Sequence, residues 1–212
     1  MNCPLCQNDK TSFFFEDKRR SYFQCQTCCL IFVPSKYWLS EEEEKKEYDL
    51  HQNSPTDDGY VKFLSRLTIP LLKIVEKNSS GLDFGSGPGP TLSLLLEREG
   101  HKVNLFDKFY ANDRAVLNTK YHFITATEVF EHLKRPELEL TLLVSLLLEK
   151  GVLGIMTKLA KDKQAFSNWH YKNDPTHICF YSEKTFLWIA ASMDLNIEFI
   201  GGDVVFLSRK NE

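Results

Sequence analysis

Three alternating glycines, Gly85, Gly87 and Gly89, follow a short apolar run and precede a leucine-rich segment. A turn of this kind lets backbone N–H groups approach a ligand closely, and the helix that opens behind it favours carboxylate or phosphate oxygens. Asp107 ends the next apolar run, about twenty residues further on, where a carboxylate that binds ribose hydroxyls is expected. Together these residues predict a cofactor pocket.

Two residues separate this pattern from the fingerprint of a nicotinamide-dinucleotide site. That fingerprint requires a third glycine where Pro90 stands, and it is usually preceded by an apolar strand, whereas Asp83 lies just before the turn. The pocket is therefore predicted to hold a different cofactor.

Four cysteines form two CxxC pairs, Cys3 with Cys6 and Cys25 with Cys28, and eighteen residues lie between the pairs. Two such pairs can complete a tetrahedron of thiolates around Zn²⁺, and zinc binding supplies folding free energy that a short segment lacks. Because four thiolates close the coordination shell, we expect a structural zinc site. Cys29 is an alternative ligand to Cys28. Two disulfides are the other reading, which is disfavoured because nothing marks the chain as secreted.

Further motifs complete a resemblance to a known family. In chain order they are Asp83-x-Gly85-x-Gly87-x-Gly89, Asp107 and Glu128-Val129-Phe130-Glu131-His132-Leu133. They resemble the signature of class I S-adenosylmethionine-dependent methyltransferases, and within that class the small-molecule methylases of the quinone-biosynthesis type. The resemblance covers about residues 60–209.

The resemblance implies S-adenosylmethionine as the methyl donor. It implies that the methionine part is held by Asp83, Gly85, Ser86, Gly87 and Gly89. It further implies that Asp107 bridges the ribose hydroxyls and that Glu128 faces the same cleft.

Three histidines are candidate catalytic residues, since an acceptor that arrives protonated needs a base. His132 follows Glu128 by about one helical turn, and a capping or surface histidine is the alternative. His170 and His177 lie in a polar and aromatic segment, residues 168–177, which could bind an aromatic ring and deprotonate it. Turn-forming residues in this segment leave open a structural role for His177.

Alternating apolar strands and amphipathic helices must position these residues. Strands are predicted over residues 81–84, 102–106, 122–126 and 152–157, and helices over residues 61–76, 90–98 and 136–149. A capped helix over residues 182–193 and a hairpin with strands at 197–200 and 204–207 follow. The predicted fold is α/β, a shortened Rossmann-like doubly wound sheet, and the resemblance implies that its last strand is antiparallel.

The sheet is expected to lack one strand. Only fifteen residues separate Asp107 from Phe123, too few for the helix, strand and helix that members of the family carry there. Because the usual adenine contacts come from the loop after that strand, Phe109, Tyr110 or Thr127 are expected to serve instead.

The chain is predicted to divide into three parts. Residues 1–37 form a small zinc-ribbon domain whose core is the aromatic residues between the cysteine pairs, and residues 61–212 form the methyltransferase domain. Residues 38–60 contain a serine-capped helix over 40–47 and then a polar loop. This loop is either a solvated linker or a lid with Tyr48, His51 and Tyr60 as cofactor contacts.

Composition limits the size of the core, the location and the class of partner expected for the protein. Its 212 residues are 42% hydrophobic and 26% charged, enough for one full-sized core with a small appendage. No apolar stretch approaches the roughly twenty residues of a membrane span, and no secretory leader is recognisable, so a cytoplasmic protein is expected. The net charge of -3 disfavours a general nucleic-acid binder.

These features predict an enzyme that transfers a methyl group from S-adenosylmethionine to a small, aromatic or apolar acceptor. One alternative is an RNA methyltransferase whose ribbon binds nucleic acid, because the ribbon carries five basic and three acidic residues. The other is a non-catalytic protein that keeps the cofactor fold and uses the ribbon to dock a partner protein.

Overall fold

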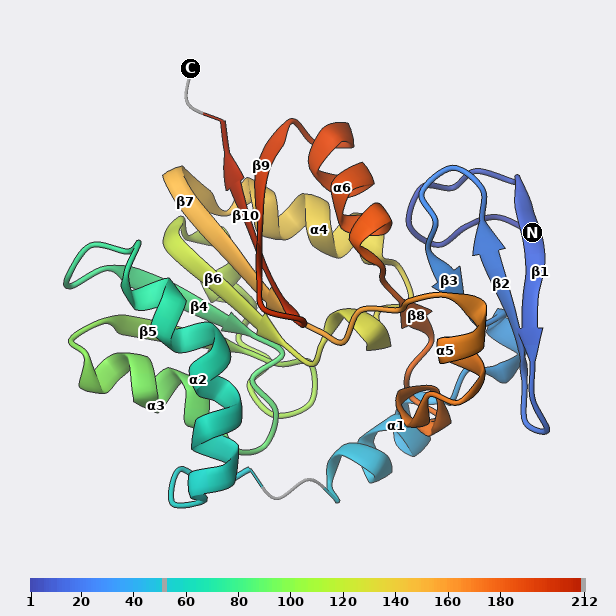
Figure 1. The fold of residues 1–212 in the computed structure, drawn as a ribbon. Coiled ribbons are helices and arrows are strands. Elements are labelled where there is room, and N and C mark those ends of the chain that lie inside the picture. Colours follow the sequence, from blue (N-terminus) through green and yellow to red (C-terminus); the bar gives the residue numbers. More distant parts are fainter. Residues whose placement is uncertain (51–52, 211–212) are drawn as a thin grey trace.

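A six-stranded sheet forms the centre of the computed structural model, which describes residues 1–50 and 53–210 (Figure 1). In the order β5-β4-β6-β7-β10-β9, the strands are β5 (Lys102–Phe106), β4 (Ser80–Phe84), β6 (Tyr121–Thr127), β7 (Leu147–Met156), β10 (Val204–Arg209) and β9 (Leu195–Ile200). The first four are parallel, and β10 is antiparallel to both β7 and β9. The predicted α/β class and the antiparallel end of the sheet are confirmed.

Both faces of the sheet are buried under helices (Figure 1). Helices α2 (Asp58–Leu72) and α3 (Thr91–Arg98) cover one face, and α4 (Pro136–Ser145) and α6 (Glu183–Ser192) cover the other. Successive side chains of β6 point to opposite faces of the sheet. Phe123 packs toward α2, while Ile124 packs toward α4. Burial on both faces explains why the strands appear in the sequence as continuous apolar runs.

The structure corrects the ends of two predicted helices. The helix predicted over residues 61–76 ends at Leu72. The helix predicted over residues 136–149 ends at Ser145, and the residues from Leu147 onward already belong to β7. A run of leucines fits a buried strand as well as a helix, so its periodicity does not locate the change. The pairing of β7 with β6 slips between Tyr121 and Phe123, where Lys150 adopts a positive φ of 62°.

The sheet is shortened where the sequence predicts it. Among the described residues, a short 3-10 helix, η2 (Arg114–Asn118), is the only regular element between β5 and β6. The loop before it is folded back on itself, because the backbones of Asp107 and Ala111 bond to each other in both directions.

A second sheet joins the cysteine-rich segment to the rest of the protein. Strands β1 (Thr11–Glu16), β2 (Ser21–Cys25) and β3 (Ile31–Phe32) are extended by β8 (Cys179–Phe180), which comes from the far end of the chain. On this sheet the ring of Tyr22 lies 5.1 Å from that of Phe166 in helix α5 (Lys163–Ser167).

The aromatic residues expected to form the core of the ribbon pack on one another, as Phe15 and Tyr22 do at 6.0 Å, and also on later parts of the chain. Tyr22, Phe166 and Phe180 form one core shared by both parts, whereas Phe13 is 56% exposed. β8 extends the ribbon sheet at its edge and α5 packs on it, since a segment this short buries too little apolar surface alone.

After a 3-10 turn, η1 (Ser35–Tyr37), comes helix α1 (Glu41–Tyr48), which Ser40 caps. The Ser40 side chain accepts from the backbone of Glu43, whose carboxylate bonds in return to the Ser40 backbone, a capping box. Within the described ranges, no helix combines the length and the apolar composition that crossing a membrane requires.

Candidate cofactor and acceptor site

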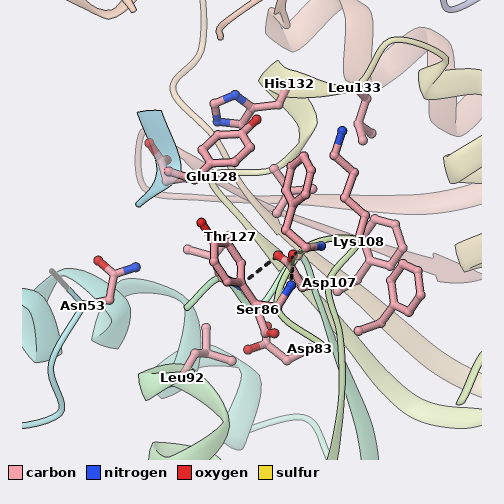
Figure 2. A pocket seen from close by; sticks show the side chains of 18 of the residues that line it. Asn53, Asp83, Ser86, Leu92, Asp107, Lys108, Thr127, Glu128, His132 and Leu133 are labelled. Atoms are coloured by element: carbon pink, nitrogen blue, oxygen red, sulfur yellow. Dashed lines mark hydrogen bonds between the residues drawn. The ribbon is translucent and has the colours of Figure 1, made fainter. Parts of the chain in front are cut away.

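A cavity of about 880 Å³ opens at the carboxyl ends of β4, β5 and β6. All seven predicted cofactor contacts line it: Asp83, Gly85, Ser86, Gly87, Gly89, Asp107 and Glu128. The adenine and lid candidates among the described residues also line it: Tyr48, Tyr60, Phe109, Tyr110 and Thr127. The lid candidate His51 lies outside the described residues. Asp83 and Ser86 lie at one end of the cavity and His132 at the other (Figure 2).

The turn after β4 requires glycine at two positions for different reasons. Gly85 has a positive φ of 75°, and a Cβ there would lie 2.4 Å from Val129. At Gly89 a Cβ would lie 2.2 Å from the backbone oxygen of Asn53. The turn is therefore packed between two segments. Val129, which precedes η3 (Phe130–His132), lies on one side, and Asn53, which precedes α2, lies on the other.

Asp83 is buried at the end of β4, with 3% of its surface exposed. Its carboxyl accepts a hydrogen bond from the Thr125 hydroxyl at 2.9 Å, and burial raises its pKa to about 7. A cation placed beside this carboxyl would favour its ionised form.

Asp107 connects the glycine turn to the loop after β5. One carboxylate oxygen accepts from the backbone N–H of Gly87 at 3.0 Å, and the other accepts from Phe109 and Tyr110 at 2.8 and 3.1 Å. These bonds fix the orientation of the carboxylate at the cavity wall.

Glu128 has a backbone conformation that is uncommon for its residue type. Its φ is +52°, and its N–H donates to the carbonyl of Met156 at 2.8 Å. One carboxyl oxygen is 3.3 Å from the Tyr171 hydroxyl, and the other is buried without a hydrogen-bond partner among the described residues. Burial raises the pKa of Glu128 to about 7.

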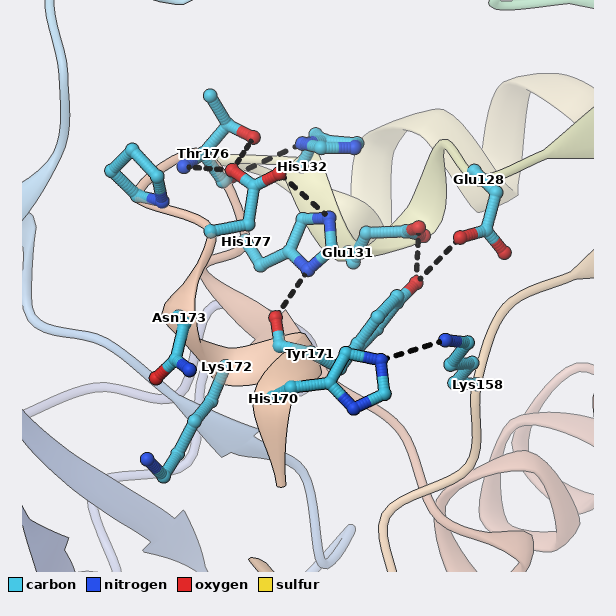
Figure 3. Close-up of polar contacts among 12 residues, drawn as sticks. Glu128, Glu131, His132, Lys158, His170, Tyr171, Lys172, Asn173, Thr176 and His177 are labelled. Atoms are coloured by element: carbon cyan, nitrogen blue, oxygen red, sulfur yellow. Dashed lines mark hydrogen bonds and ion pairs between the residues drawn. The ribbon is translucent and has the colours of Figure 1, made fainter. Parts of the chain in front are cut away.

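The structure also reveals a buried polar group that the sequence did not single out. Glu131, fully buried in η3, accepts a hydrogen bond from the hydroxyl of Tyr171 (Figure 3). It accepts a second from the hydroxyl of Thr157 at 3.0 Å. Burial, followed by the nearby charge of Glu128, raises the pKa of Glu131 to about 8. In the sequence Glu131 appears only as a member of the motif Glu128-Val129-Phe130-Glu131-His132-Leu133, with no role of its own.

Two of the three candidate histidines lie together. The rings of His132 and His177 are 4.7 Å apart, and their Nδ1 atoms are 3.2 and 2.7 Å from the backbone oxygens of Thr176 and Tyr171. Burial lowers the pKa of His177 to about 4, so its imidazole is neutral at physiological pH.

His170 lies apart from the other two, in the short helix η4 (His170–Asn173). Its exposed ring lies 3.3 Å from the Lys158 ammonium at the cavity wall (Figure 3).

The four cysteines of the CxxC pairs are also brought together. Their sulfur atoms all lie within 4.8 Å of one another, with Cys3 3.5 Å from Cys28 and Cys6 3.4 Å from Cys25. A tetrahedral zinc ion bonded to four thiolates places the sulfurs about 3.8 Å apart, so this arrangement fits one. Cys29, at a positive φ of 60°, lies outside the cluster, and all six cysteines are free of disulfides.

Comparison with known proteins decides the family. A family model described as a methyltransferase domain matches residues 57–198. The chain is a class I S-adenosylmethionine-dependent methyltransferase. No curated protein matches the methyltransferase.

Solved structures share the fold of this methyltransferase at low sequence identity. Magnesium protoporphyrin IX methyltransferase from Synechocystis PCC 6803, solved with bound SAH, is 15% identical, with a TM-score of 0.56 over 80% of this chain and 94% of the other. A putative S-adenosylmethionine-dependent methyltransferase from Methanococcus maripaludis is 11% identical, with a TM-score of 0.52 over 84% of this chain and 96% of the other. The similarity covers nearly the whole of both relatives.

Proposed function

We propose that the methyltransferase methylates a small, aromatic or apolar acceptor bound at the histidine end of the cavity. The observation that carries the proposal is the division of one cavity into two chemically different ends. The turn-side end holds Asp83 and Asp107, while the other end holds His132, His177 and the Tyr171 ring. The named substrate of the Synechocystis relative, a porphyrin, belongs to the same broad class of acceptor.

S-adenosylmethionine supplies an activated methyl group on a sulfonium, so the protein mainly aligns the reacting atoms. In the proposed arrangement Asp83 accepts from the ammonium of the methionine part, and the backbone of the glycine turn binds its carboxylate. Asp107 bridges the ribose hydroxyls. Phe109, Tyr110 or Thr127 contacts the adenine. All three line the cavity, and Phe109 and Tyr110 follow the edge strand β5.

Alignment of acceptor and methyl group is the largest contribution expected from this site. Holding two reactants in the reactive geometry contributes up to roughly 7–11 kcal/mol. The acceptor contacts proposed are His132, His170 and His177. Because His177 is buried and neutral, it serves to position the acceptor rather than to supply a charge.

We also propose roles for the segments in front of the sheet. Residues 1–37 form a ribbon in which Cys3, Cys6, Cys25 and Cys28 bind a structural zinc, and residues 61–212 form the catalytic domain. Residues 38–60 act as a lid, supported by the position of Tyr48 and Tyr60 at the cavity wall. Zinc-binding thiols are typical of reducing compartments, which supports a cytoplasmic location.

The test is transfer of labelled methyl from S-adenosylmethionine into a cell extract, with small-molecule, RNA and protein fractions counted separately. Label in the small-molecule fraction that is lost with Asp83→Ala is the expected result. Label in RNA would instead support an RNA methyltransferase and overturn the proposed acceptor class.

A further inference from the structure

Three metal-ligating side chains meet beside the acceptor end of the cavity, where His132 and His177 line the wall and Glu131 is fully buried. A carboxylate oxygen of Glu131 and one ring nitrogen each of His132 and His177 all lie within 4.8 Å of one another. Glu131 and His177 are buried, and His132 is half-buried. The cluster joins η3, directly after β6, to the segment after η4, so two separate parts of the chain build it (Figure 3).

The two histidines are oriented as metal ligands usually are. Their Nδ1 atoms face the carbonyl oxygens of Thr176 and Tyr171. A carbonyl only accepts hydrogen bonds, so each Nδ1 carries a proton, and the Nε2 of His177 lies 3.6 Å from a carboxylate oxygen of Asp174. Such outer hydrogen bonds fix the tautomer and the ring orientation of metal-binding histidines.

The carboxylate is oriented in the same way. The hydroxyls of Thr157 and Tyr171 both donate to Glu131, and the Tyr171 hydroxyl also contacts Glu128. Glu128 brings a second carboxylate to the same hydroxyl, with one oxygen buried and unpartnered among the described residues. A cation at the cluster would place a positive charge beside Glu131, whose carboxyl is buried next to that of Glu128.

We propose that Glu131, His132 and His177 bind a divalent metal ion in the reaction cavity, separate from the four-cysteine site. Two imidazoles and a carboxylate suit Mn²⁺, Fe²⁺ or Zn²⁺, whereas four thiolates select zinc. Three protein ligands leave coordination positions for a substrate.

The role of this ion rests on the proposed function and makes it more specific, because it selects an oxygen acceptor. An acceptor hydroxyl that binds the ion loses its proton to water. The resulting oxyanion attacks the methyl carbon, so that the C–O bond forms as the C–S bond breaks and its electron pair stays on sulfur. The products are a methyl ether and S-adenosylhomocysteine. The predicted substrate class is a phenol or another hydroxyl compound.

The test uses Mn²⁺ added to the purified full-length protein with zinc in the cysteine site, followed by the electron paramagnetic resonance signal of free Mn²⁺. Wild-type protein is expected to bind one Mn²⁺ per chain. Glu131→Gln and His177→Gln are expected to weaken binding at least about tenfold, since even outer ligand partners change metal affinity by that factor. The exposed Glu137→Gln and His122→Gln are matched controls and should bind like wild type.

Two further measurements separate the possible failures. His132→Gln changes a half-buried ligand and must show the same loss even if a buried variant unfolds. Failure of wild type to bind Mn²⁺, or undiminished binding by the ligand variants, overturns the metal site. Calorimetric binding of S-adenosylhomocysteine is measured on the same samples, and its absence would overturn the proposed function while leaving the metal result intact.

Discussion

At the residue scale, Asp83 makes the cofactor-free protein sensitive to pH. Burial raises its pKa from 3.8 to about 7, so the protonated form is favoured in the folded state. Its contribution to stability is complete below the unfolded pKa and is lost as the pH rises through about 7. Above pH 7 the buried charge costs up to about 4 kcal/mol, because each unit of pKa shift corresponds to about 1.4 kcal/mol.

Asp83→Asn is therefore expected to raise the melting temperature of the cofactor-free protein at pH 8.5 more than at pH 5. The amide keeps an oxygen for the Thr125 hydroxyl and cannot ionise. Melting curves at the two pH values measure the difference, with the exposed Asp9→Asn as the control. Equal shifts at both pH values would contradict the assignment of the buried charge.

The affinity for the cofactor is expected to rise with pH, whereas the stability contributed by Asp83 falls with pH. The ammonium of S-adenosylhomocysteine interacts best with an ionised carboxylate, so its affinity for wild type is expected to rise between pH 5.5 and 8. Asp83→Asn removes this slope and weakens binding by about tenfold at pH 8, in keeping with a hydrogen bond to a charged group. Calorimetric titration at several pH values tests this, and a slope that persists in the variant would exclude Asp83 as its source.

At the element scale, Glu44 holds helix α1 against the segments that follow β5 and η3. This carboxylate is almost fully buried and pairs with Lys108 at 2.8 Å and Lys134 at 2.7 Å. Tyr48 lies one turn further along the helix and lines the cavity, while Asp49 accepts from the Tyr110 hydroxyl at 2.6 Å. The ion pairs therefore connect the rim of the cavity to the element that carries Tyr48.

Glu44→Gln is expected to make α1 open more readily. Both lysines are partly exposed, so the pairs contribute about 1 kcal/mol rather than the full value of buried pairs. Amide hydrogen exchange in residues 41–48 should accelerate about fivefold. Glu42→Gln removes an exposed pair with Lys46 in the same helix and should have little effect. Similar exchange in the two variants would show that Glu44 does not hold the helix.

At the scale of the whole molecule, the ribbon supports the loop that carries the candidate acceptor residues. The buried guanidinium of Arg20 donates to the backbone oxygens of Lys172, Asp174 and Pro175, at 2.7, 2.8 and 3.2 Å. The neighbouring Arg19 donates to the Asn173 oxygen at 2.6 Å. Two of the basic residues that suggested RNA binding thus bind the protein's own backbone.

Loss of the proposed zinc is therefore expected to destabilise the whole protein in a single step. Ser replacing both Cys3 and Cys6 should abolish bound zinc, lower the melting temperature in one cooperative transition and reduce methyl transfer together with it. Zinc analysis and differential scanning calorimetry measure these effects, with Cys29→Ser as the matched control outside the cluster. Two separate transitions would show that the ribbon and the catalytic domain unfold independently.

Local sequence patterns predicted most strands and helices of the central sheet but few of the contacts between distant segments. The glycine turn, Asp107 and the capped start of α6 carry their signals within a few residues. By contrast, β8 has two residues and no periodicity, and its pairing with β3 is set by distant packing. The contact of Glu131 with Tyr171 likewise joins residues forty positions apart, which no single-sequence pattern encodes.

The pairing of β3 with β8 also determines when the smaller sheet can be completed as the chain is synthesised. Ile31 leaves the ribosome about 150 residues before its partner Phe180. The three strands β1 to β3 can therefore pair with one another and bind metal while the edge at β3 has no partner strand. An unpaired edge with apolar side chains is a site of mispairing between nascent chains. The earliest sheet to emerge is thus among the last to be completed.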